Sequence, residues 1–165
     1  MDNFTEEMSK YREEPGCDWK YVNKMWASMA YKMGTVDEDI VSPVVRPLLE
    51  KYFNCEIIER GIRYQKWTKD GRYFGIGVLA VSKDKVFMIE IRANPSIVYI
   101  QEILEKAEHF REFFPVYNDK ELIPIIAGFV FNDDVINYAN KKHLYIMAYR
   151  EWEYMDIINF DEVKK

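Results

Sequence analysis

The stretch YFGIGVLAVSKDKVFMIEIR, residues 73–92, decides the fold of this chain. It predicts two strands, at 73–82 and 86–92, joined by a tight turn at Lys83 and Asp84. Both strands are apolar at nearly every position, which is typical of strands that are covered on both faces. They are therefore expected to lie next to each other in the middle of a sheet.

The segments around this hairpin supply the rest of the sheet. Residues 56–68 alternate as a strand does, and Asp70-Gly71 predicts a second tight turn before residue 73. Helical and strand patterns then alternate toward the C-terminus, in elements at 96–114, 122–131, 133–142 and 144–148. A three-stranded antiparallel meander followed by a crossover helix and further strands predicts a mixed α/β sheet with helices on both faces.

Two helices are expected before the sheet. The first follows the apolar spacing from Trp19 to Met33, after a polar arm. The second follows Thr35, with Glu38 completing a capping box, and runs to about Phe53. Two prolines inside it are expected to break or kink it, Pro43 and Pro47.

The composition indicates one cytoplasmic domain. The chain has 165 residues, of which 48% are hydrophobic and 31% charged, enough for one ordinary core. We find no run of roughly 18 apolar residues and no signal-peptide pattern at the start, so no membrane contact is expected. The cysteines, Cys17 and Cys55, lie far apart in sequence and are expected to be reduced thiols.

Glu90 is the residue that indicates chemistry. A carboxylate inside an apolar central strand costs several kcal/mol unless a cation, a metal or hydrogen bonds compensate it. Arg92, two residues on, is expected on the same face. With the turn at Lys83 and Asp84, Ser82 pairs with Lys85 and Gly77 lies opposite Glu90, unless a one-residue bulge intervenes.

This order of elements, with a strand ending in Glu-x-basic, resembles the PD-(D/E)XK restriction-endonuclease-like superfamily. The likeness extends to a prokaryotic branch through MGTVDEDI at 33–40, FREFFP at 110–115 and Tyr138-Ala139. It implies an N-terminal arm and helix at 1–33 and a nuclease-like domain at 34–165.

The resemblance also implies site residues. Glu90 matches the family's glutamate, Arg92 stands where the family has lysine, and Gly77 stands where it has a metal-binding aspartate. Glu38 resembles an acidic residue of the first core helix. The implied Mg²⁺ ligands are Glu38 and Glu90, with Arg92 stabilising charge; an arginine cannot act as a general base.

A basic cluster indicates a local nucleic-acid contact. The net charge of −5 argues against electrostatic binding of nucleic acid over the whole surface. The members of the cluster are interleaved with Tyr64, Trp67 and Tyr73, a mixture that contacts phosphates and stacks on bases. A solvated hairpin is the alternative. The basic residues are Arg60, Arg63, Lys66, Lys69 and Arg72.

Three functions follow as hypotheses. The first is a catalytically impaired nuclease-like domain that still contacts DNA through the basic cluster. The second is a non-catalytic homodimeric assembly module that uses the helix from Trp19 to Met33. The third is an active Mg²⁺-dependent DNA endonuclease that binds metal through Glu38 and Glu90.

Overall fold

A computed structural model describes residues 38–150 and 154–164. The side chains of Glu38, Asp39 and Ile40 lie outside this description. So do the polar arm and the helix predicted from Trp19 to Met33. The dimer interface expected on that helix therefore stays a prediction.

The antiparallel meander is confirmed. Strands β1 (Glu59–Trp67), β2 (Tyr73–Val81) and β3 (Lys85–Ile91) pair in sequence order. The turn between β2 and β3 has the expected register, since the amide of Ser82 donates to the Lys85 carbonyl at 2.8 Å. The turn between β1 and β2 places Gly71 at φ 86°, a conformation that glycine adopts without steric cost.

The second half of the chain extends this meander into a mixed sheet of six strands in the order β1-β2-β3-β4-β5-β6. β4 runs parallel to β3, β5 runs parallel to β4, and β6 closes the sheet antiparallel to β5. The elements after β3 are α4 (Ile97–Phe113), the short helix η1 (Pro115–Tyr117), β4 (Glu121–Ala127), α5 (Asp133–Lys141), β5 (Tyr145–Arg150), β6 (Tyr154–Ile157) and α6 (Phe160–Val163).

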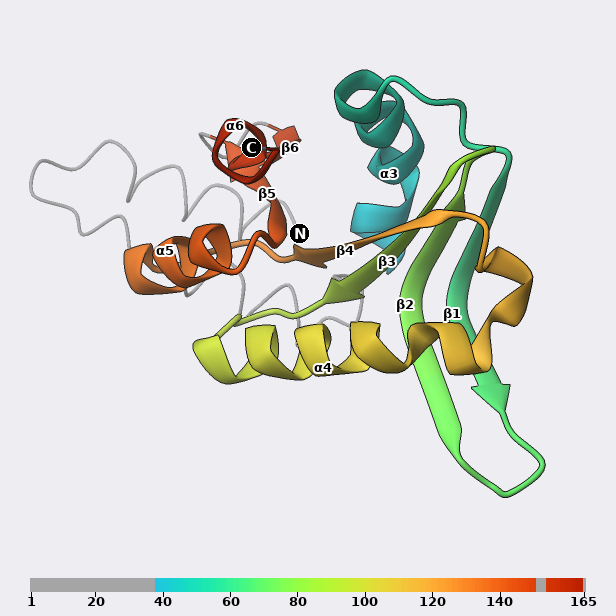
Figure 1. Ribbon diagram of the computed structural model, residues 1–165. Helices are drawn as coiled ribbons and strands as arrows, with labels where there is room; N and C mark the ends of the chain where they lie inside the picture. Colours follow the sequence, from blue (N-terminus) through green and yellow to red (C-terminus); the bar gives the residue numbers. More distant parts are fainter. Residues whose placement is uncertain (1–37, 151–153, 165) are drawn as a thin grey trace, which may run out of the picture.

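Helices cover both faces of this sheet, as the sequence predicted (Figure 1). Helix α3 (Glu38–Phe53) packs Val41 and Val45 with Ile89 of β3 on one face. Helices α4 and α5 pack Ile100 and Ala139 against the opposite face. Each face thus has its own apolar layer. Among the described helices, none has the length and apolar character required to cross a bilayer.

Helix α3 corrects the expectation of a break. It is one helix of 16 residues with Pro43 and Pro47 inside it. Both prolines lie on its exposed side, where water can satisfy the carbonyl groups that lose their intrahelical partner. The opposite side of the helix buries Val45 and Leu49 completely. That burial holds the helix together across the two missing hydrogen bonds.

The C-terminal half of the chain also differs from the prediction. The strand expected to run to Phe131 ends at Ala127, which pairs with the last residue of β3, Ile91. The last strand, β6, and the short helix α6 were not predicted. They are only four residues long each, too short for a periodic pattern to stand out.

Candidate functional site

Glu90 is buried at the end of β3 and is compensated by two cations. Its side chain is only 5% exposed. The ammonium group of Lys106, on α4, lies 2.8 Å from Oε1, and the guanidinium of Arg92 lies 3.6 Å from Oε2. Arg92 was the predicted partner. Lys106 was missed, because a helix residue 16 positions away in sequence gives no signal of this contact.

The two cations remain partly open to solvent. The side chains of Arg92 and Lys106 are 35% and 27% exposed. Arg92 also donates to the carbonyl of Ile91 at 2.8 Å and lies over the ring of Tyr99. Lys106 lies over the ring of Phe74, 5.2 Å from its centre. These contacts fix both groups in place, so they present positive charge in a defined position.

The chain changes face close by, at Gly77 and Arg63. Ile76 packs in the layer beneath α4, and Val78, two residues on, packs in the layer beneath α3. Regular alternation would have put both on one face. On β1, Arg63 has φ 50°, and it is the position opposite Gly77 at which the β1–β2 ladder is interrupted. The strands therefore twist locally at this pair.

This twist changes the direction in which a side chain at position 77 would point. Continued beyond its last pair, Val78 with Ile89, the β2–β3 register would bring Gly77 opposite Glu90. A Cβ at Gly77, however, would lie 3.7 Å from the side chain of Ile91 and 3.1 Å from the carbonyl of Ile89. Ile91 belongs to the layer beneath α3, whereas Glu90 faces Lys106 on α4. The side chain of an aspartate at position 77 would therefore point toward Ile91, in the layer beneath α3.

A cleft lies beside the part of β2 that extends beyond its pairing with β3. It has a volume of about 330 Å³, and Glu90 is one of the residues that line it. The charged residues that line it, within the part of the chain that the structure describes, are one carboxylate, Glu90, and three cations, Arg63, Arg92 and Lys106. The remaining lining residues are Tyr64, Gln65, Tyr73, Gly75, Ile76, Gly77 and Ile91. The cleft is thus locally cationic in a chain whose net charge is −5.

The basic cluster predicted to contact nucleic acid does not share one face. Arg60 donates to the Ser42 carbonyl at 2.9 Å and ties β1 to α3. Lys66 lies on the other side, over the ring of Phe114. Arg72 pairs with Asp70 and with Glu112 of α4, at 3.0 and 2.9 Å.

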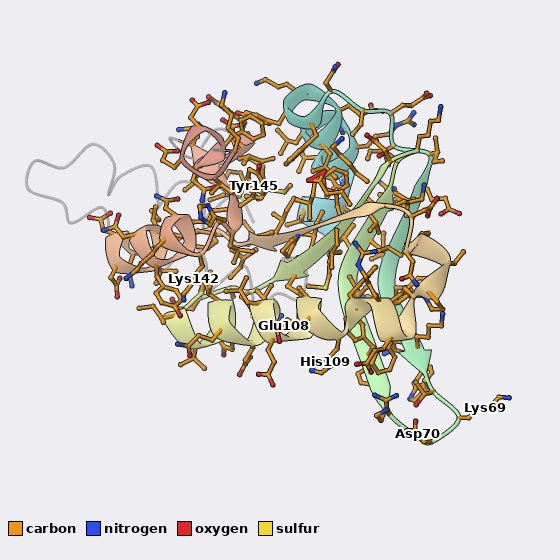
Figure 2. All side chains as sticks on the ribbon, viewed as in Figure 1. Lys69, Asp70, Glu108, His109, Lys142 and Tyr145 are labelled. Carbon is orange, nitrogen blue, oxygen red and sulfur yellow. The ribbon has the colours of Figure 1, made fainter. Side chains whose placement is uncertain are left out.

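Two residues of the cluster are differently placed. Lys69 lies at the exposed tip of the β1–β2 hairpin, next to Asp70 (Figure 2). Arg63 lines the cleft. Of the five predicted residues, Arg63 is therefore the one that the structure brings together with Glu90 and Arg92.

The described residues do not fit a Mg²⁺ site by themselves. No group of three His, Cys, Asp or Glu residues within 38–150 and 154–164 is arranged to hold a metal. Among the described residues, Glu90 is the one carboxylate that lines the cleft, and its two oxygens contact cations. The side chain of Glu38 lies outside the description, so its predicted pairing with Glu90 around Mg²⁺ stays a prediction.

The comparisons with known proteins leave the family open. No protein-family model and no curated protein matches the chain. Seven chains of solved structures match. One is the small subunit of the heterodimeric restriction endonuclease R.BspD6I, with 10% identity and a TM-score of 0.33 over 90% of this chain and 72% of that chain. The predicted α/β class is confirmed by the strand order and pairing described above, and membership of the superfamily stays a prediction.

Proposed function

We propose that this domain binds nucleic acid through its phosphates, in the cleft above Glu90, and that it does not cleave the strand. The observation that carries the proposal is the contact of Lys106 and Arg92 with a single buried carboxylate. Two cations fixed around one anion leave positive charge on the side that faces the cleft. Among anions, phosphate groups are bound best by Arg and Lys side chains that are held in fixed positions.

The same contacts argue against metal-dependent cleavage. Mg²⁺ is held by one or two carboxylates together with substrate phosphate and water. To bind it, Glu90 would have to release Lys106 at 2.8 Å and place the metal beside two cations. An arginine in place of the family's lysine cannot act as the general base for an attacking water. The charges of the cleft therefore suit a bound phosphate better than a bound metal.

Fluorescence anisotropy of a labelled oligonucleotide, measured between about 50 and 200 mM salt, tests the proposal. We expect Lys106→Gln and Arg92→Gln each to weaken binding and to reduce the salt slope by about one. Lys142→Gln is the matched control, since Lys142 also lies over an aromatic ring, that of Tyr138 of α5, but does not line the cleft (Figure 2). Circular dichroism verifies that each variant is folded. Unchanged affinity and slope in both cleft variants would overturn the proposal.

The absence of cleavage is tested separately. Wild-type protein is incubated with plasmid and with single-stranded DNA in Mg²⁺ or Mn²⁺, next to Glu90→Gln. We expect no product from either protein. Cleavage by the wild type that disappears in Glu90→Gln would contradict the non-catalytic assignment and support the Mg²⁺-dependent endonuclease instead.

A further inference from the structure

An exposed aromatic pair stands on the β1–β2 hairpin next to the cleft. Trp67 and Tyr73 are 62% and 54% exposed, and they are opposite each other in the ladder. Their ring centres are 5.5 Å apart with the planes inclined at 47°. The hairpin projects beyond α4, so the pair lies away from the main apolar layers (Figure 1). Large aromatic groups exposed together indicate a surface that binds something.

The pair occupies the hairpin face that is turned away from α4. The α4 face of the hairpin is already used, because Tyr64 and Lys66 both contact the ring of Phe114. Successive strand residues point to opposite faces. Trp67 and Tyr73 therefore lie on the other face, where no described helix covers them.

Tyr73 connects this face to the cleft. Its ring lies along the strand over Gly75, so a Cβ at Gly75 would be 2.9 Å from Cζ of Tyr73 and closer still to its hydroxyl. The amide of Gln65 donates to that hydroxyl at 3.4 Å. Tyr73, Gly75 and Gln65 all line the cleft. The aromatic surface and the cationic cleft thus form one continuous site.

From this continuity we infer that the ligand of the cleft is single-stranded nucleic acid, with one or more unpaired bases stacked on Trp67 and Tyr73. The inference rests on the proposed function and specifies its ligand. Cations that hold the backbone beside aromatic rings that stack on bases are the combination that binds single strands without reading sequence. The bases of an intact duplex are already stacked on each other, so they cannot use this pair.

Anisotropy with an oligothymidine and with a blunt duplex of equal length tests the inference. We expect the wild type to bind the single strand more tightly. Trp67→Ala and Tyr73→Ala should each weaken single-strand binding by about tenfold. Trp67 does not line the cleft, so Trp67→Ala should also leave the weaker duplex binding unchanged. Trp67→Phe, which keeps a ring, should restore most of the loss.

Two further variants sharpen the test. Tyr154→Ala is the matched control, because Tyr154 is 52% exposed on the opposite edge of the sheet, and it should bind as the wild type does. Gly75→Ala removes no aromatic group but displaces the ring of Tyr73. It should therefore weaken single-strand binding in the same direction as Tyr73→Ala.

The outcomes separate the two proposals. If Trp67→Ala changes the affinity for single strand and duplex equally, or changes neither, the inference is overturned. The Lys106 and Arg92 variants then still test phosphate binding. Loss of a dimer in Trp67→Ala, with no affinity for either nucleic acid, would overturn both and assign the pair to contact with a second copy of the chain.

Discussion

The hydroxyl of Tyr52, on α3, lies 2.5 Å from a carboxylate oxygen of Asp156, on β6, 104 positions later in the chain. This hydrogen bond fastens the first described helix to the last strand. Arg150 donates to the other oxygen of the same carboxylate. Asp156 is 5% exposed, so all of its main partners come from the protein.

The hydrogen bond between Tyr52 and Asp156 predicts a loss of stability at high pH. Burial, together with that bond and the charge of Asp156, raises the pKa of Tyr52 from 10.0 to about 12. The folded chain keeps this proton where the unfolded chain loses it. Its contribution is therefore complete below pH 10 and disappears as the pH rises to about 12. Urea unfolding should show this slope in the wild type and not in Tyr52→Phe, which should also be about 1 kcal/mol less stable near neutral pH.

Asp156 predicts the opposite dependence, at acid pH. Burial alone would raise its pKa, but the hydrogen bonds from Tyr52 and Arg150 lower it below its ordinary value of 3.8. The stabilisation is therefore complete above that value and is lost as the pH falls through the lower folded pKa. Asp156→Asn should unfold with a weaker acid dependence than the wild type. If Asp156→Asn and the wild type lose the same free energy of unfolding as the pH falls, this prediction is contradicted.

The contact between Lys106 and Glu90 predicts strong energetic coupling. Removing one partner leaves the other charge buried and poorly compensated, so Lys106→Met should cost about 2–3 kcal/mol. Glu90→Gln/Lys106→Met should lose less than the sum of the two single variants. Thermal and urea unfolding measure the cycle. The exposed pair Lys164 and Asp161 is the control, and its coupling should be below about 0.5 kcal/mol.

Gly128 predicts a backbone effect on the cleft. A Cβ there would lie 2.6 Å from the carbonyl oxygen of Arg92 and 2.9 Å from Pro95. Gly128→Ala should therefore destabilise the fold by about 1–3 kcal/mol and weaken nucleic-acid binding by moving Arg92. Gly71→Ala is the comparison for stability, because its cost of about 1–2 kcal/mol comes from the left-handed backbone alone. Binding by Gly128→Ala that equals that of the wild type would contradict the link to Arg92.

The sequence predicted the fold well wherever a local pattern determines it. The turn at Lys83 and Asp84 determines the β2–β3 register, and the structure has the expected pairing of Ser82 with Lys85. Ser96 caps α4 as expected, accepting from the amide of Tyr99. Both features depend on residues within three positions of each other, so they can be read from the sequence.

The site could be predicted only in part, because its geometry depends on contacts between distant residues. Glu90 and Arg92 were found because they are two residues apart at the end of one strand, which ends at Ile91. Lys106 required the position of α4 across the sheet, and the face change at Gly77 required the backbone of Arg63 on the neighbouring strand. Neither leaves a pattern in the sequence. The basic cluster was dispersed for the same reason.

The strictly sequential strand order has a consequence for synthesis. Every strand of the sheet pairs with its immediate neighbours along the chain, from β1 to β6. A nascent chain can therefore add each strand to the sheet as it leaves the ribosome, without waiting for a later one, because domains begin to fold from the N-terminus during synthesis. Until β6 arrives, β5 is the open edge. The bond between Tyr52 and Asp156 forms only then, and among the described residues the ring contacts of Tyr52 and Phe53 with Phe160 of α6 come later still.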